Sequence, residues 1–343
     1  MESPFPVSTT SAAPTATPAA VISVQPIDTP VRRGGTAALG VRSPYADATY
    51  RWFRLREGQA HFSRIATTRR LTVAGTAANQ DSQYRVVVRA DGRRASSATV
   101  SVRVVDPTAT PVADYLSRLG TDATLQTGDS AVGLQGVDIS YYNPTGASAE
   151  AAAAGWQFEI LKAGGSDGSG GAYPDSTYKA KVASARAAGL KLGHYWYNGR
   201  GSAKKDADAF VSALTSYKLG DPLVLDIEPY AGKKSGSLHP EWGPTKAARF
   251  LKRVGDLVPG ANLYVYMTTR TTHAHDWTPV ARVARLWVSS WGKNLGRVPA
   301  SEPDVGTWKT WTIWQYSSYG LPAGFGDRAI DVDIARNDAW TAK

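Results

Sequence analysis

The stretch DPLVLDIEPY, at residues 221–230, is a short apolar run that ends in acidic residues. The apolar run covers residues 223–225, and Asp226 and Glu228 follow it two positions apart. A short continuous apolar run bounded by turn residues predicts a buried strand of a parallel sheet. Side chains at i and i+2 of a strand point to the same face, so both carboxylates should leave its carboxyl end together, with Cα atoms about 6–7 Å apart.

Similar apolar runs recur on both sides of this stretch and alternate with segments of helical apolar spacing. The expected helices cover residues 177–190, 204–217 and 244–258. The other expected strands cover residues 133–140, 158–164, 190–197, 262–268, 285–291, 311–317 and 329–335. Strand–helix alternation on this scale predicts an α/β barrel of the TIM kind within residues 132–343, and little helix separates its last strands.

Two more of the expected strands carry acids near their ends. Asp138 lies in the first strand, and Asp331 and Asp333 lie in the last. The carboxyl ends of parallel barrel strands converge on one face, where active sites lie. Two carboxyls held close together cannot both ionise freely, so one keeps its proton to higher pH. Glycoside hydrolysis needs that division between an acid and a carboxylate, although ion pairs and Mg²⁺ sites produce the same pattern.

The ordered motifs resemble family 25 of the glycoside hydrolases, the N-acetylmuramidase lysozymes of bacteria and phages. The motifs are GVDIS, FEILKAGG, GHYWY, LVLDIE, NLYVY, LWVSSW, WTIWQYS and AIDVDIA, within residues 133–335. The resemblance implies a (β/α)5(β)3 barrel. It also implies cleavage of the β-1,4 bond between N-acetylmuramic acid and N-acetylglucosamine.

The resemblance also implies roles for the acids. By motif, Glu228 is the general acid, Asp226 orients the substrate or stabilises the developing charge, and Asp138 completes an acidic floor. In the last strand the family usually has an aspartate followed two positions later by asparagine. Here Asp331 is aligned with that aspartate, and Asp333 stands in place of the asparagine. Direct displacement and assistance by the substrate's acetamido group both fit this set of residues.

Aromatic and amide side chains near the strand ends are expected to line a sugar groove, because flat apolar ring faces with polar edges suit pyranose rings. The expected substrate-binding residues are Tyr195, Tyr197, Tyr264, Trp287, Trp314, Gln315 and Asp333. Lys162, isolated in an apolar strand, is expected at the barrel mouth, because a buried lysine needs a partner. The histidines are scattered, so no metal ion and no other cofactor is expected.

Residues 21–106 show a different sequence pattern, with short runs of alternating apolar and polar residues separated by turns. This alternation predicts a small antiparallel β-sandwich with a hairpin turn at residues 91–92. Trp52 on the third run and Tyr84 shortly after an acidic residue make the segment similar to the immunoglobulin-like modules of bacterial and phage surface proteins. Val86 stands where such a fold carries its second cysteine. Trp52 and Tyr84 are expected in the core.

The remaining segments and the charge complete the expected organisation. Residues 1–20 are rich in Ser, Thr, Pro and Ala and predict a disordered tail, and residues 107–131 predict a linker with a short helical piece. The net charge is +10, and residues 1–106 hold 14 Arg against 7 acidic residues. Such a basic segment favours anionic partners, among them anionic wall polymers. It lacks the aromatic residues that stack on bases, so nucleic acid is not an expected partner.

The sequence therefore predicts a modular, monomeric peptidoglycan hydrolase, an endolysin-like enzyme whose partner is the glycan strand. It has no cysteine, no apolar run long enough to span a membrane and no visible secretory signal. We expect residence in a phage host's cytoplasm until release to the wall, or a virion-borne or extracellular enzyme. The alternatives are a non-catalytic wall-binding or virion structural protein and a hydrolase of another polysaccharide.

Overall fold

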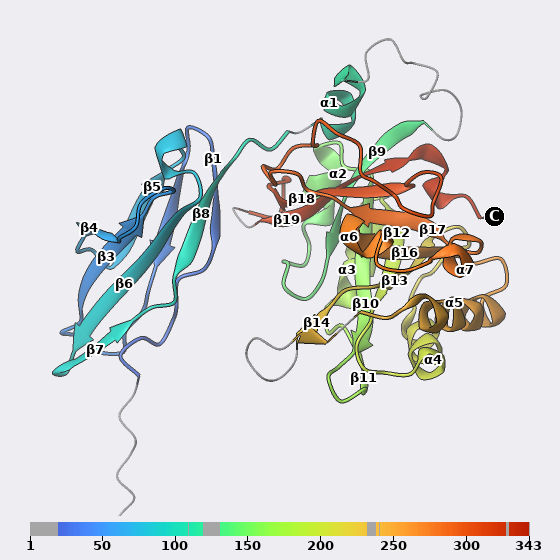
Figure 1. Cartoon of the computed structure of the whole chain (residues 1–343), viewed down its shortest axis with the longest axis horizontal. Helices are drawn as coiled ribbons and strands as arrows, with labels where there is room; N and C mark the ends of the chain where they lie inside the picture. The colour runs from blue at the N-terminus through green and yellow to red at the C-terminus, as the bar shows by residue number, and fades with distance from the viewer. Residues whose placement is uncertain are drawn as a thin grey trace, which may run out of the picture. The chain divides into compact units, whose positions relative to one another are not determined.

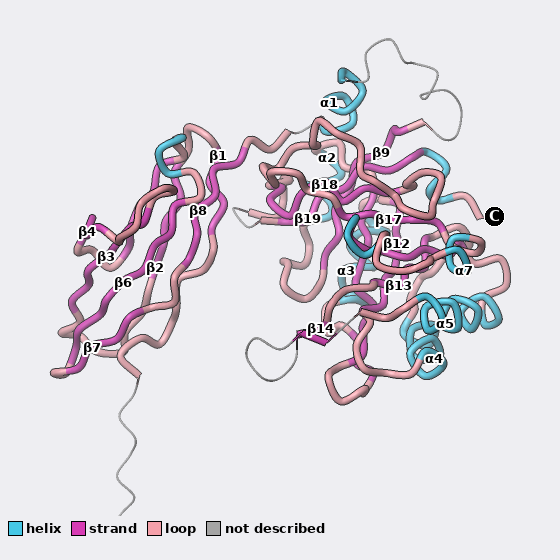
Figure 2. Tube along the Cα trace, viewed as in Figure 1, coloured by secondary structure: helices cyan, strands magenta, loops and turns pink. Residues whose placement is uncertain are grey.

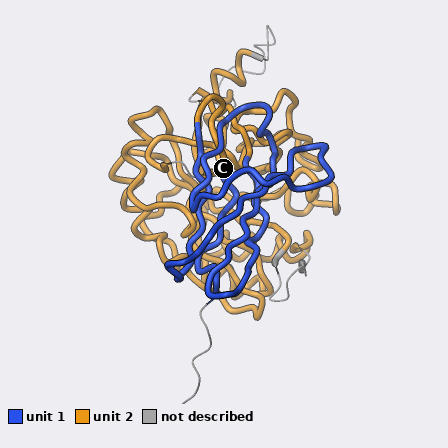
Figure 3. The backbone as a smooth tube through the Cα atoms, turned by 90° about the vertical axis from the view of Figure 1, so that its left-hand side faces the viewer, with its two compact units in different colours: residues 1–29, 36–102 blue, residues 30–35, 103–343 orange. Residues whose placement is uncertain are grey.

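The computed structural model describes residues 20–108, 110–118, 131–231, 238–239, 241–326 and 329–342. Residues 1–19 of the expected tail and 119–130 of the expected linker lie outside this range. The chain divides into two compact units, shown in Figure 3, with one boundary at Val102 and Arg103. The short segment Pro30–Gly35 belongs with the C-terminal unit. Each unit is described by itself below.

The N-terminal part of the chain forms two β-sheets (Figures 1 and 2). Its elements are β1 (Thr29–Arg32), β2 (Thr36–Gly40), β3 (Thr49–Leu55), β4 (Ser63–Ala66), β5 (Arg70–Ala74), η1 (Ala77–Asn79), β6 (Ser82–Ala90), β7 (Arg93–Ser96) and β8 (Val100–Val105). One sheet has the order β1-β8-β6-β3-β4, with β7 paired to β6, and the other pairs β2 with β5. The prediction of a β-rich N-terminal part is confirmed.

The core residues expected in this part are buried. Trp52 on β3 and Val86 on β6 are paired across the sheet and are both 0% exposed. Tyr84 lies on the same face of β6, two residues before Val86, and is also buried. Asp91 and Gly92 join β6 to β7 with φ angles of 51° and 64°, the left-handed backbone that a tight hairpin turn requires. The expected hairpin is therefore confirmed.

The C-terminal unit is a closed barrel of eight strands. They are β9 (Val132–Ile139), β10 (Phe158–Ser166), β12 (Lys191–Tyr197), β13 (Pro222–Asp226), β16 (Asn262–Thr268), β17 (Arg285–Ser289), β18 (Ile313–Gly320) and β19 (Ile330–Arg336). The order around the barrel is β10-β12-β13-β16-β17-β18-β19-β9, and β9 closes it by pairing with β10. Among these eight strands all recorded pairings are parallel except those of β19, which runs antiparallel to β18 and β9. The sequence predicted these strands to within a few residues.

Helices separate the first five barrel strands. They are α2 (Ser148–Ala153), α3 (Tyr178–Ala187), α4 (Ala203–Ala213) and α5 (Pro244–Leu257), followed by the short α6 (Thr269–Thr272) and α7 (Thr278–Ala281). Small hairpins add β11 (Ala172–Pro174), β14 (Tyr230–Ala231) and β15 (Leu238–His239), and η3 (Asn337–Trp340) follows the last strand. Among the described residues, the connections between β17, β18 and β19 contain no helix, as the sequence predicted. None of the described helices is long and apolar enough to span a membrane.

Two apolar cores stabilise the barrel unit. One fills the barrel interior and includes Phe158, Tyr264, Tyr266 and Trp287. The other lies between the strands and the surrounding helices. Successive side chains of a strand point to opposite faces, so each strand supplies both cores, and its sequence is apolar almost throughout. The inward side chains that are polar include Asp138, Gln315 and Asp333.

Helix α1 (Pro111–Arg118), in the segment expected as a linker, packs on the barrel unit. Its Tyr115 is 7% exposed, and the ring lies edge-on to Trp311 and Trp314 at centroid distances of 6.0 and 6.4 Å. The Tyr115 hydroxyl donates a hydrogen bond to Glu302. This part of the segment therefore contributes to the outer core rather than only connecting two domains.

Candidate functional site

The carboxyl ends of β9 and β13 and the amino end of β19 bring the expected acids to one mouth of the barrel. The expectation of a parallel last strand is corrected, since β19 runs antiparallel and reaches the mouth with its first residues. Asp138 on β9 lies directly opposite Asp331 on β19 in the strand register. Across the barrel, Asp226 is the last residue of β13, and Glu228 follows two residues later. In addition to burial, the charge of Glu228 raises the pKa of Asp138, and the charge of Asp138 raises the pKa of Asp226, so the two sides of the mouth are close enough to interact. The sequence-predicted acids therefore form one cluster.

Glu228 is positioned by Asn198, a residue that the sequence analysis did not single out. The Glu228 backbone N–H donates to Asn198 Oδ1 at 2.6 Å, and Asn198 Nδ2 donates to the Glu228 carbonyl at 3.1 Å. Asn198 is itself 0% exposed, and its backbone N–H donates to the Asp226 carbonyl. Because β13 ends at Asp226, this paired amide contact holds the chain beyond the strand. The signal in the sequence is an asparagine just past the expected strand 190–197.

Asp333 lies deeper than Asp331 in the same strand. Its side chain is 0% exposed, and Oδ1 accepts a hydrogen bond of 2.8 Å from Trp287 Nε1. Asp331 is partly exposed, and its carboxyl is influenced by the charges of Asp138 and Glu228. Thus both aspartates of the last strand reach the acidic cluster. Asp331 borders the solvent-facing part, whereas Asp333 belongs to the floor.

Gln315 on β18 connects the acidic floor to the rim. Its Nε2 donates to Asp138 Oδ2 at 2.7 Å. Its Oε1 accepts hydrogen bonds from Tyr266 Oη and from Trp291 Nε1, each at 2.9 Å. Gln315 is 3% exposed, so these bonds form in a site from which water is largely excluded. The amide orients an acid and two aromatic rings at once.

Burial and mutual repulsion raise the pKa values of the clustered acids. Burial is the main cause at Asp138, and the nearby Asp333 charge raises the pKa of Asp138 further. Burial followed by the charge of Glu228 raises the pKa of Asp226 well above its usual range. Burial also raises the pKa of Glu228. The site therefore holds protons that exposed carboxyls would release, as general acid chemistry requires.

Lys162 supplies a positive charge to this acidic mouth, where the sequence analysis expected it. Its charge lowers the pKa values of Asp226 and Glu228 and opposes the effect of burial. The ammonium lies 4.6 Å from the ring centre of Tyr197 and 5.9 Å from that of Tyr195. Tyr195 is 8% exposed, and burial, followed by the negative charges of the cluster, raises the pKa of its hydroxyl. Both tyrosines therefore border the site.

Two of the expected groove residues lie elsewhere. Tyr264 is inside the barrel near its amino end, where its hydroxyl donates to the carbonyl of Ala339. Trp314 points out of the barrel into the outer core and donates from Nε1 to the Ser290 carbonyl. The expectation for Tyr264 is corrected because Tyr264 points into the barrel two residues before Tyr266, which places it one layer of side chains below the mouth. That for Trp314 is corrected because neighbours in a strand face opposite ways, and Gln315 takes the inward position.

Two aromatic residues take the places of the corrected ones. Tyr266, two residues after Tyr264, bonds Gln315 and stacks edge-on against Trp287 at 4.5 Å between ring centres. Trp291, the last residue of the LWVSSW motif, is 38% exposed at the rim. Both were visible as aromatic residues near strand ends. Their depth in the barrel could not be read from the sequence.

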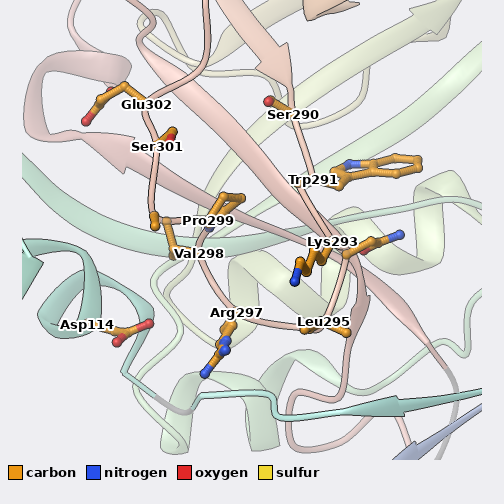
Figure 4. Close-up of a pocket in the computed structure, with 13 residues that line it drawn as sticks. Asp114, Ser290, Trp291, Lys293, Leu295, Arg297, Val298, Pro299, Ser301 and Glu302 are labelled. Atoms are coloured by element: carbon orange, nitrogen blue, oxygen red, sulfur yellow. The ribbon is translucent and has the colours of Figure 1, made fainter. Parts of the chain in front are cut away.

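A pocket of about 610 Å³ opens beside Trp291 (Figure 4). Trp291 and Ser290 form one wall, the loop that continues to Glu302 forms another, and Asp114 of α1 lies across from that loop. The acids of the mouth do not line this pocket. Among the described residues, no group of three or more His, Asp or Glu side chains is arranged to hold a metal ion.

The barrel unit is similar to known proteins. The model of the glycosyl hydrolases family 25 matches residues 137–325. Lysozyme M1 of Streptomyces globisporus is 28% identical over 216 residues, which cover 60% of this chain and 67% of that protein. A bacterial lysozyme structure from Streptomyces coelicolor is 26% identical, with 59% of this chain and 92% of that chain covered and a TM-score of 0.48. A muramidase structure from Trichobolus zukalii is 24% identical, covers 60% of this chain and 94% of its own, and has a TM-score of 0.47.

Proposed function

This chain belongs to family 25 of the glycosyl hydrolases and is a muramidase that hydrolyses peptidoglycan, and we propose that Glu228 is its general acid. In this proposal Glu228 protonates the oxygen of the β-1,4 bond between N-acetylmuramic acid and N-acetylglucosamine as that bond breaks. Asp226 then stabilises the positive charge that develops on the sugar ring. Asp138 and Asp331 orient the substrate from the opposite side of the mouth.

The observation that carries this assignment is the contrast between Glu228 and Asp226. Glu228 lies past the strand end and is partly exposed, so it can reach a substrate oxygen, and burial raises its pKa. Asp226 is 5% exposed at the strand end; burial raises its pKa as well, and the charge of Lys162 opposes the rise at both acids. An acid that reaches outward at the edge and a second carboxyl held below it match the two tasks of glycoside hydrolysis.

Digestion of purified peptidoglycan tests the reaction, and Glu228→Gln tests the assignment. Mass analysis of the fragments should find reducing muramic acid ends, whereas reducing glucosamine ends would contradict the bond assignment. Glutamine keeps the shape of Glu228 but has no acidic proton, so activity should fall by about 10²–10⁴-fold. The thermal unfolding midpoint should change little. Near-normal activity of this variant would remove Glu228 from the acid role.

We further propose that the N-terminal part is an immunoglobulin-like module that binds anionic wall polymers. Its exposed arginines within Thr36–Val102 are Arg42, Arg51, Arg56, Arg64, Arg69, Arg70, Arg89 and Arg94. Arg89 and Arg94 stand directly opposite each other in the β6–β7 register. Like charges in that position destabilise a sheet, and a bound polyanion would remove the repulsion. This pair is the observation that supports the proposal.

Pelleting of the full chain with purified walls tests this second proposal. Arg89→Gln with Arg94→Gln should weaken binding, and the difference from the unchanged protein should shrink as salt rises, because exposed charges are screened over about 8–10 Å at physiological ionic strength. A control removes two exposed charges from the barrel helices, Lys205→Gln with Arg249→Gln. Equal binding by both double variants at every salt concentration would contradict a targeting role.

A further inference from the structure

Three aromatic side chains are exposed among the described residues, and all three follow barrel strands at the carboxyl end. Tyr141 and Tyr142 come directly after β9 and are 46% and 70% exposed, and Trp291 follows β17 and is 38% exposed. The rings of Tyr141 and Tyr142 lie against each other, with centroids 3.9 Å apart and planes inclined by 35°. A single exposed aromatic residue is ordinary, but two rings in contact beside an active site form a continuous apolar surface.

Buried polar contacts hold the Tyr141–Tyr142 pair in place. Lys181 is 2% exposed and donates to the carbonyls of Ser140 and Asn143 at 2.6 and 3.0 Å, on either side of the pair. The Tyr141 backbone N–H donates to Asp175 Oδ2 at 2.8 Å. A buried ammonium group is costly without acceptors, so these bonds fix the backbone of the loop. The two rings are therefore presented to solvent on a rigid support.

The pair lies close to the acids and on the far side of the mouth from Trp291. Tyr141 is three residues after Asp138, so their Cα atoms are at most about 11 Å apart. Around the barrel, β9 and β17 are separated by β18 and β19, and β13 lies between them on the other side. A chain running from Trp291 to Tyr142 therefore crosses the mouth where Asp138, Asp226 and Glu228 lie.

We propose that the Tyr141–Tyr142 pair is a platform for a sugar ring of the glycan strand beyond the sugars that contact the acids. The inference rests on the proposed function, because it extends the same site to a longer substrate. A pyranose ring presents a face of C–H groups that can lie on the Tyr142 ring, while its hydroxyls remain in water. The platform binds a distant sugar equally in the ground state and the transition state, so it lowers KM for long strands and leaves kcat unchanged.

Kinetics on glycan strands of different length test the platform. Tyr142→Ala should raise KM for long soluble glycan strands by about three- to tenfold, the effect of losing one aromatic stacking contact. It should leave KM unchanged for the shortest oligosaccharide that the enzyme cleaves. Tyr142→Phe keeps the ring and should behave as the unchanged protein. Leu219→Ala removes a side chain of similar exposure, 67%, before the amino end of β13, and should change neither value.

The outcomes separate this proposal from the catalytic one. An equal change on short and long substrates, no change on long strands, or a loss in Tyr142→Phe as large as in Tyr142→Ala would each overturn the platform. A fall in kcat with KM unchanged would also overturn it. Glu228→Gln is measured on the same short oligosaccharide. Full activity there would reject the acid assignment, whatever Tyr142→Ala does.

Discussion

Replacing Gln315 with leucine should remove three hydrogen bonds from the floor of the acidic mouth at once. Leucine has a similar size but no polar group, so Asp138 loses a donor and the Tyr266 hydroxyl and Trp291 N–H lose their acceptor. Asp138 and Tyr266 are 7% and 5% exposed, so water reaches them poorly. Trp291 is 38% exposed and can bond to water instead. Two buried polar groups are therefore left without their partner.

The expected loss of unfolding free energy follows from these two buried groups. A buried group that loses a hydrogen-bond partner costs about 1–3 kcal/mol, so the free energy of unfolding should fall by about 2–6 kcal/mol for the two groups. For a unit of this size each kcal/mol lowers the unfolding midpoint by about 2–4 °C, which predicts a decrease of about 4–24 °C. Thermal unfolding followed by circular dichroism measures this change.

The same substitution should change the pH dependence of activity. The Gln315 amide lowers the pKa of Asp138, against burial and the charge of Asp333, which raise it. Without the amide the pKa of Asp138 rises further. If Asp138 acts as a carboxylate, the acidic limb of the kcat/KM profile moves to higher pH, and the loss of activity is larger at low pH than at high pH.

Gln135→Leu is the matched control. Gln135 is also a buried glutamine of the barrel, 7% exposed, and its Nε2 donates to the exposed Gly155 carbonyl, which can bond to water. We expect a loss of about 0.5–1.5 kcal/mol and an unchanged pH profile. Equal unfolding free energies of the two variants, or an unmoved acidic limb in Gln315→Leu, would refute the role of Gln315 as the connection between floor and rim.

Three further predictions concern the acids, the lower barrel and α1. Asp331→Asn should lose at least about tenfold more activity than Asp333→Asn, because general acid–base groups contribute about 10²–10⁴-fold. Wall-lysis rates measure this difference, and the reverse order would show that Asp333 is the functional aspartate. Tyr264→Phe should leave KM unchanged and lower the unfolding free energy by about 0.5–1.5 kcal/mol through loss of its bond to Ala339, and a raised KM would return Tyr264 to the groove. A fragment of residues 107–343 should be more stable than one of residues 132–343 by about 1.5–3 kcal/mol, because only the longer fragment buries Tyr115. Urea unfolding measures this difference, and equal stability would show that α1 is only a connection.

The alternation of apolar runs was enough to place the barrel strands and the acids at one mouth. Asp226 follows a buried run, and Asp138 occupies the same position in another strand, so parallel pairing brings them to the same end. The i, i+2 spacing of Asp226 and Glu228 likewise predicts a shared face. These inferences need only the period of a strand and the direction in which strands pair. The period is a local property, and the parallel direction follows from the alternation of strands with helices along the chain.

Depth within the barrel is not a local property. Tyr264 and Tyr266 share a face and differ by one layer, and the register of β16 against β13 and β17 sets which of them reaches Gln315. Trp291 reaches the same amide from a loop, and α1 adds Tyr115 to the outer core from a segment that looked like a linker. Strand period tells which way a side chain points. How far along the barrel axis it lies, and what it meets there, depends on pairings between residues far apart in the chain.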